Sequence, residues 1–431
     1  MFSLNVDLDI LKIKWLQAKN YSNAVHALPV VAAVVALAFF VPRTSNRNAN
    51  VSAPNAAPAP SVLQREPPRT AEEGLINWAT DRGAQIGFEL RKSPEGYRGA
   101  YATKDYNVGQ QIAVIPSELT IPLENNGGFP AEHAHALAIK MSTNPTFMAQ
   151  FSPYFSTLPM PNETVTSEVF TDKMMGELQS AKLKDLVERE RTIMAGVYYG
   201  KYTNRETNKT YEPIPKALGG KDAFPVVLFA HLTSIISTRE FTFYNEDGSR
   251  AADRMVPVVD MINTDADKLN AQQYNDGSSL VIRARNPIKK GEELFLAYLP
   301  GLDHRNDVSL TGYGFIRSLE RPLLPASDLP TFDTEHPYGE TPSTDDVFYG
   351  PEGSYNTEEE LERLKKLLAD CPTTLAEDEA ALLSDGKNDE TIDLNNYRSR
   401  VIVEFRVERK KALISAIEAV EKELALKSEA S

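Results

Sequence analysis

The sequence predicts an α+β protein in which small β-sheets surround a helical insert, with further helices at the end. Residues 88–123 contain short β-rich pieces separated by turns, a pattern typical of small sheets. Residues 131–200 and 226–238 have helical patterns, and the insert is predicted over about residues 130–224. From residue 357 the chain is charged and carries two apolar stripes at helical spacing: Leu361, Leu364 and Leu368, then Leu413, Ile417, Val420 and Leu424.

The globular body is predicted to begin with a helix over residues 71–82. Thr70 and Glu73 stand three residues apart, as a capping box requires. Leu75 and Ala79 then lie on one apolar face at helical spacing.

Two later segments also have distinctive patterns. Residues 255–263 form an apolar run that contains one acid, and residues 280–298 are predicted to form a hairpin-like pair with its turn at Lys290–Gly291. Alternate residues at the end of this pair share one face by the period-two rule: Leu294, Leu296 and Tyr298.

Composition and charge limit the classes of partner. The chain has 431 residues, a formal net charge of −14 and 42% hydrophobic residues, which is ordinary for a folded protein. Because phosphate binding needs clustered Lys and Arg, no nucleic-acid partner is expected, whereas a basic protein would suit the charge. The single cysteine, Cys371, excludes an internal disulfide and a zinc cluster of several thiolates, and it is interpreted as a bystander thiol.

The N-terminal segment, residues 1–70, differs from the rest of the chain. Residues 27–41 are apolar and uncharged, although a bilayer span usually needs about 20 such residues. Residues 44–70 are rich in Asn, Ala, Pro and Ser, as in a disordered linker or an organelle-targeting segment. The run is interpreted as a membrane anchor or targeting segment, retained or cleaved, with a buried core helix as the alternative. The expected location is a membrane or an organelle, either plastid or endomembrane, and otherwise the cytoplasm.

Common catalytic motifs are missing from the sequence. It contains no phosphate-binding loop, no Gly-x-Ser-x-Gly and no His-Glu-x-x-His. His133 and His135 are two residues apart and would not share a helix face, so they are interpreted as packing or surface residues and no metal site is expected.

Three segments are more informative when they are taken in order. The first is the glycine-containing stretch 96–102, where the backbone could approach a ligand closely. The second is residues 260–263, Asp-Met-Ile-Asn, which end a buried run with an amide that needs a partner. The third is residues 291–298, Gly-Glu-Glu-Leu-Phe-Leu-Ala-Tyr, followed by Tyr-Gly-Phe at residues 313–315.

This series resembles the SET domain of the Rubisco large-subunit methyltransferase-like group, which also includes the actin-histidine methyltransferase. The resemblance runs from about Glu73 to Leu323 and includes Trp78, residues 154–159 and residues 237–241. It implies a SET domain over residues 71–325 whose chain forms a pseudo-knot, a linker over residues 326–356, and a shortened C-terminal helical domain over residues 357–431.

The resemblance also implies roles for particular residues. Tyr298 would be the catalytic tyrosine. The cofactor, S-adenosylmethionine, would be bound by Gly96, Tyr97, Arg98, Gly99, Asn263 and Thr264. The substrate would be bound by Arg239, Asp260, Tyr274 and Tyr313.

The sequence departs from the family on the cofactor side. Tyr97 stands where the family has the first glycine of its Gly-x-Gly, or Gly96 takes that place with one extra residue. Thr264 replaces the usual His after Asn263.

The resemblance therefore implies transfer of a methyl group from S-adenosylmethionine to a protein, with lysine as the expected target. Histidine methylation is the alternative activity. A degenerate SET fold that acts as a membrane-tethered binding module would also explain the departures, and the substrate protein and the oligomeric state are left open.

Overall fold

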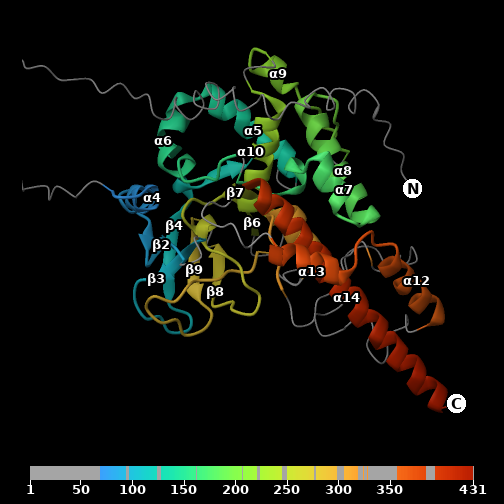
Figure 1. Cartoon of the computed structure of the whole chain (residues 1–431). Helices are drawn as coiled ribbons and strands as arrows, with labels where there is room; N and C mark the ends of the chain where they lie inside the picture. The colour runs from blue at the N-terminus through green and yellow to red at the C-terminus, as the bar shows by residue number, and fades with distance from the viewer. Residues whose placement is uncertain are drawn as a thin grey trace, which may run out of the picture.

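A computed structural model describes residues 68–93, 97–123, 128–161, 163–205, 207–220, 224–244, 250–275, 278–298, 305–318, 324, 328, 357–384 and 394–430. It combines three small sheets with a helical insert and a C-terminal group of helices (Figure 1). The predicted anchor at residues 27–41 and nearly all of the predicted linker at 326–356 lie outside these residues. Within the described part of the chain, no helix combines the length and the apolar character that a membrane crossing requires.

All the strand pairs in the three sheets are antiparallel. The sheets have the orders β1-β4-β9-β8, β2-β3 and β5-β7-β6. The strands are β1 (Gln85–Ile86), β2 (Phe88–Lys92), β3 (Arg98–Ala102), β4 (Gln111–Pro116), β5 (Ile121–Leu123), β6 (Glu240–Tyr244), β7 (Arg250–Met255), β8 (Ala271–Asn275) and β9 (Ser279–Ala284). The predicted β-rich stretch at residues 88–123 is confirmed.

Helices come before, within and after these sheets. Of the described helices, the first is α4 (Ala71–Thr80), and the predicted cap is confirmed because Thr70 Oγ1 accepts a hydrogen bond from the Glu73 N–H at 3.1 Å. Between β5 and β6 lie α5 (Pro130–Thr143), α6 (Pro145–Phe155), η3 (Ser167–Val169), α7 (Asp172–Glu177), α8 (Ala181–Tyr198), α9 (Ile214–Ala217) and α10 (Val226–Arg239). After β9 come α11 (Asn306–Val308), η5 (Ser309–Tyr313), α12 (Glu358–Ala369), α13 (Leu375–Ser384) and α14 (Leu394–Ala430).

The predicted hairpin over residues 280–298 is wrong. β9 pairs with β4 and β8, so both of its edges are already occupied. Residues 292–298 pair elsewhere, through isolated bridges from Tyr101 to Glu293 and from Asn263 to Phe295. Leu294 and Leu296 are buried in the core as expected. The prediction failed because a turn signal marks a reversal of the chain but does not identify the strand that will be its partner.

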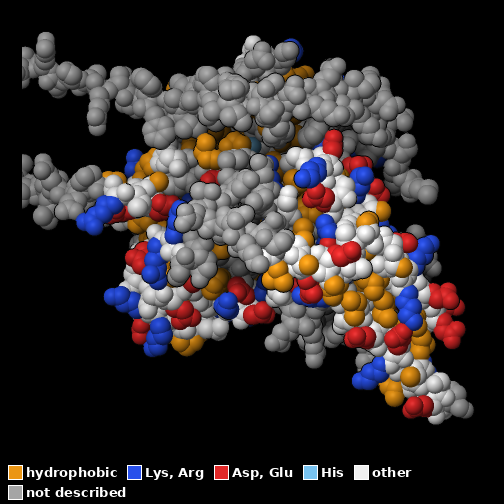
Figure 2. All heavy atoms as spheres, in the orientation of Figure 1, with side chains coloured by type: hydrophobic (Ala, Val, Ile, Leu, Met, Phe, Trp, Pro, Cys, Tyr) orange, Lys and Arg blue, Asp and Glu red, His pale blue; other side chains and the backbone are white. Residues whose placement is uncertain are grey.

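The two apolar stripes predicted in the C-terminal helices pack against each other. Leu364 of α12 and Leu413, Ile417 and Val420 of α14 belong to one buried cluster. The N-terminal half of α14 contacts the helical insert instead, where Phe405 packs in a cluster with residues of α7, α8 and η5. Figure 2 shows acidic and basic side chains intermingled over these C-terminal helices.

Gly314 fixes the end of η5 against the insert. Its φ is 77°, and a Cβ at this position would lie 2.2 Å from the carbonyl oxygen of Val165. A side chain here would be strained by the left-handed backbone and would also push the two segments apart.

We predict that Gly314→Ala lowers the free energy of unfolding by about 2–4 kcal/mol, since backbone strain and overpacking add. Gly312→Ala, two residues earlier in η5, is the matched control, because nothing lies within 4 Å of a Cβ there and φ is not in the left-handed region. Urea denaturation measures the free energy of unfolding of both variants. Equal stability of the two would contradict this account of Gly314.

Candidate active site

A cavity of about 580 Å³ lies where the three sequence segments meet. Its lining comes from β3, from the turn after β7, from residues 293–298, from residues 159–166 and from the end of η5. This volume falls within the range of ordinary small-molecule sites, about 300–1,000 Å³.

Residues 292–298 hold the three segments together through main-chain hydrogen bonds. On one side, the Leu294 N–H donates to the Ala100 carbonyl of β3 at 2.8 Å. On the other side, the Leu296 N–H donates to the Asn263 carbonyl at 2.9 Å. The segment therefore lies between β3 and the turn after β7, and it brings the predicted cofactor residues of both together.

The Asn263 amide crosses this junction. Its Nδ2 donates to the Arg98 carbonyl at 2.8 Å and to Glu293 Oε1 at 2.9 Å. Glu293 also accepts a hydrogen bond from the Tyr101 hydroxyl at 3.2 Å. A Cβ on Gly99 would lie 2.2 Å from Glu293 Oε1, so the glycine leaves room for this carboxylate.

A buried ionic cluster forms another part of the wall. Arg239, the last residue of α10, donates through Nη1 to the Asp260 main-chain carbonyl at 2.9 Å and lies 3.3 Å from Asp260 Oδ2. The Tyr154 hydroxyl donates to the same Oδ2 at 2.5 Å. Asp260 lies on the short helix η4 (Val259–Met261). The residue before this helix is Val258, a buried β-branched residue with a φ of 76°. Such a backbone is strained, and the surrounding core holds it in place.

The burial of this cluster shifts its ionisation. Burial raises the pKa of Asp260, although the nearby guanidinium of Arg239 opposes the shift. Burial and then the Asp260 carboxylate raise the pKa of Tyr154 well above its usual value. Burial lowers the pKa of Arg239, but the nearby Asp260 and Tyr154 raise it by more, so the pKa of Arg239 is raised overall.

Tyr298 lines the same cavity as Arg239 and Asp260. Its hydroxyl donates to the Ile262 carbonyl at 2.8 Å, and its ring centroid is 4.9 Å from that of Tyr313. Burial raises the pKa of Tyr298 to about 12, so its hydroxyl keeps its proton at physiological pH. The residue therefore presents a neutral hydroxyl dipole and an aromatic face.

Polar atoms without a partner are concentrated at this cavity. Among the described residues, five buried side-chain nitrogen or oxygen atoms have no hydrogen-bond partner. Four of them belong to residues that line the cavity: Ser93 Oγ, Arg239 Nε, Asp260 Oδ1 and Thr264 Oγ1. Because an unsatisfied buried polar atom is costly, their concentration here indicates that a polar ligand completes the site.

Most of the predicted site residues line one cavity. They are Tyr97, Arg98, Arg239, Asp260, Asn263, Thr264, Tyr298 and Tyr313. Gly99 is buried in β3 behind this lining, and Gly96 lies outside the described residues. Tyr97 is 63% exposed, so it stands at the mouth.

Tyr274, which was predicted to lie on the substrate side, is apart from the residues that line this cavity. It lies on β8, at the edge of its sheet, and does not line the cavity. Its side chain is 41% exposed and carries the Arg283 guanidinium over its ring. β8 takes its register from β9, which directs this tyrosine away from the site.

Two residues of the site had no predicted role. Glu293 connects Asn263 with Tyr101, and Tyr154 bonds to Asp260. Both stand inside segments that the sequence singled out, but their partners are distant along the chain, so no local spacing could indicate the contacts.

The predicted packing role of the two histidines agrees with the structure, since both are buried. His133 Nδ1 lies 2.9 Å from Glu240, and His135 Nε2 lies 2.7 Å from the Glu212 carbonyl. Cys371 is half-buried, and its thiol lies 3.4 Å from the Leu367 carbonyl. In the described part of the chain, no three His, Cys, Asp or Glu side chains are placed to hold a metal ion.

Comparisons with curated proteins find methyltransferases. Actin-histidine N-methyltransferase of Xenopus tropicalis is 24% identical over 244 residues, covering 52% of this chain and 40% of that protein. The protein of the same name from Homo sapiens is 24% identical over 242 residues, covering 52% of this chain and 39% of its own length. The chain thus spans about two fifths of the length of these relatives.

Comparisons with solved structures agree on the fold. Rubisco LSMT bound to AdoMet matches with a TM-score of 0.54 at 18% identity, over 84% of this chain and 94% of that one. The SET domain of LSMT bound to lysine and AdoHcy matches with a TM-score of 0.53 at 19% identity, over 82% and 91%. Residues 97–299 match the model of the SET domain family, so this segment of the chain is similar to a SET domain.

Proposed function

We propose that this chain is an S-adenosylmethionine-dependent protein methyltransferase whose target is a lysine side chain. The observation that carries the proposal is the cavity beside Tyr298, which lies in the SET domain and gathers four unsatisfied buried polar atoms. The relatives and fold neighbours are named as protein methyltransferases, which supports the same reaction class.

The lining residues suit a zwitterionic nucleoside cofactor. Arg98 and Lys268 provide cations for a carboxylate, and the carboxylates of Asp265 and Glu293 provide acceptors for an ammonium or for hydroxyl groups. Thr264 replaces the expected histidine, but its buried Oγ1 has no partner among the described residues and so offers a hydrogen bond to the ligand. When bound, S-adenosylmethionine supplies an electrophilic methyl group on a sulfonium sulfur.

The chain's own groups would orient and activate the substrate nitrogen. An amine attacks only when it is neutral, and the rings of Tyr298 and Tyr313 form a poorly solvated wall that lowers the pKa of an entering lysine. Asp260 Oδ1 has no partner among the described residues and can accept a hydrogen bond from the amine. The ammonium of an entering lysine would release its proton to water, and the neutral amine would then accept the methyl group and leave as a methylated ammonium. Tyr298 keeps its own proton and acts through its hydroxyl dipole.

Histidine is the second candidate target. The curated relatives are named as actin-histidine methyltransferases, whereas one fold neighbour was solved with lysine bound. An imidazole nitrogen is already neutral near pH 7, so a histidine enzyme would depend less on desolvation of its substrate. A labelled-cofactor reaction with cell lysate, followed by acid hydrolysis, separates methyl-lysine from methylhistidine.

Two further parts of the proposal rest on the sequence. The apolar run at residues 27–41 supports attachment to a membrane or targeting to an organelle. The charged helices from residue 357 support a separate helical domain after the SET domain. A binding module without activity is the competing function, and it requires that labelled methyl groups are not transferred to any protein.

We predict that Tyr298→Phe reduces turnover roughly hundredfold or more, since it removes a fixed dipole at the reacting atoms. Affinity for S-adenosylmethionine should change little, because the ring and its packing against Tyr313 remain. Tyr274→Phe removes the same group outside the cavity and should leave turnover unchanged. Transfer of labelled methyl groups measures turnover, and calorimetry measures affinity for S-adenosylmethionine. Wild-type turnover in Tyr298→Phe would show that Tyr298 is not catalytic.

We also predict that Thr264→Val weakens S-adenosylmethionine binding by about 1 kcal/mol without lowering stability, because it deletes a hydroxyl that is unsatisfied in the free protein. Thr242→Val is the control, since Thr242 Oγ1 already donates to Asp253 at 3.0 Å. That variant should lose stability and keep its affinity. Calorimetry and thermal unfolding measure both, and a destabilised Thr264→Val with normal affinity would contradict the assignment.

A further inference from the structure

A second, smaller cavity of about 290 Å³ lies next to the first. Three stretches of chain contribute to the lining of both cavities: residues 164–168, 237–240 and 311–315. Tyr313 belongs to both linings, so the two cavities are neighbours that share this residue.

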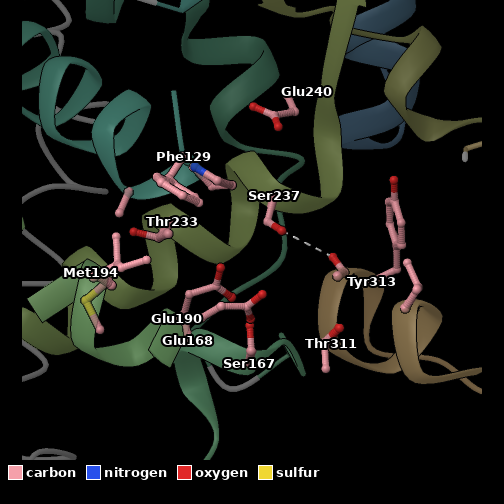
Figure 3. Close-up of a pocket in the computed structure, with 15 residues that line it drawn as sticks. Phe129, Ser167, Glu168, Glu190, Met194, Thr233, Ser237, Glu240, Thr311 and Tyr313 are labelled. Carbon is pink, nitrogen blue, oxygen red and sulfur yellow. Dashed lines mark hydrogen bonds between the residues drawn. The ribbon is translucent and has the colours of Figure 1, made fainter. Parts of the chain in front are cut away.

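The smaller cavity is acidic. Glu168 of η3, Glu190 of α8 and Glu240 of β6 line it, and no Lys, Arg or His is among its described lining residues. Figure 3 shows the Glu168 and Glu190 carboxylates reaching from different elements into the same space below Ser237. The rest of the lining is apolar or carries hydroxyl groups, including Phe129, Ile193, Met194, Thr233 and Thr311.

Glu168 carries the fifth of the buried polar atoms that lack a partner among the described residues. The residue is 7% exposed, and its Oε2 has no hydrogen-bond partner among the described residues. Burial raises the pKa of Glu168 to about 7 and also raises the pKa of Glu190. Glu240 differs from these two because it already has His133 Nδ1 at 2.9 Å. A buried carboxylate with a vacant oxygen is costly unless a donor reaches it.

We propose that this cavity binds the basic side chain of an arginine or lysine that lies a few residues from the methylated position in the substrate protein. The inference rests on the proposed function, because it assigns the substrate's neighbouring residue. A guanidinium or ammonium would donate to Glu168 Oε2 and Glu190, while its aliphatic stem would pack on Ile193, Met194 and Phe129.

The position of the cavity fits a second contact with one polypeptide. The target side chain would stand beside Tyr298 on one side of Tyr313, and the basic side chain would stand on the other. Two anchors on either side of one ring would fix the register of an extended substrate, and the chain's net charge of −14 would attract a basic protein.

The test uses Nα-acetyl-arginine methylamide as the probe and the citrulline analogue as its neutral counterpart, with NMR titration of the full chain. The arginine probe should bind and the citrulline probe should not. Glu168→Gln should weaken arginine binding roughly tenfold or more, as expected for loss of a charged hydrogen bond. Glu188→Gln, an exposed residue on the same helix as Glu190, should leave binding unchanged.

Thermal unfolding establishes that each variant is folded, and Glu190→Gln provides the same test if Glu168→Gln is not. Absence of arginine binding, or equal binding by wild type and both cavity variants, would overturn this inference. S-adenosylmethionine affinity and methyl transfer are measured in parallel. If S-adenosylmethionine does not bind and no methyl group is transferred while the arginine probe still binds, the proposed function is wrong but the site for a basic side chain is supported.

Discussion

Residues 292–298 run between β3 and the turn that follows β7, and their main chain is hydrogen-bonded to both. Each strand edge that meets this segment would otherwise expose unpaired N–H and C=O groups inside the protein. The pairing fixes the position of each side chain along the segment. Leu294 and Leu296 enter the core, while Glu293 and Phe295 face the cavity and Tyr298 follows at its end.

The ionic cluster of Asp260, Arg239 and Tyr154 is supported by this framework. Removing both charges from water is unfavourable, and their mutual attraction offsets only part of the penalty. Asp260 Oδ1 and Arg239 Nε still lack partners among the described residues. A cluster that served stability alone would be better replaced by apolar residues, so its retention fits a role in ligand binding. The strained backbone at Val258 supports the same view, because strain of this kind collects at functional sites.

Sequence patterns predicted the local structure well. The cap at Thr70, the helical insert and the packing stripes of α12 and α14 follow from residue spacing, which is a local property. The order of the three segments also indicated that Asn263 and Tyr298 belong to one site, and the structure places both in the lining of one cavity.

The failures concern pairing between distant segments. Periodicity shows that residues 292–298 are extended, but it cannot show that β9 already has two neighbours. In the same way, the register of β8 sends Tyr274 to an exposed edge, and the contact between Tyr154 and Asp260 joins residues 106 positions apart. The acidic cavity was missed for the same reason, because its three glutamates come from three separate elements.

Tyr313 stands in the walls of both cavities, and its ring touches that of Tyr298. A side chain shared in this way couples the two spaces thermodynamically. If a group bound in the smaller cavity restrains Tyr313, the binding of a side chain beside Tyr298 afterwards costs less conformational entropy. The coupling free energy is the same whichever of the two groups binds first. A substrate that carries both the target side chain and the basic side chain would then bind with a more favourable free energy than the sum of the two separate binding free energies. The chain would discriminate between substrate proteins through this cooperativity.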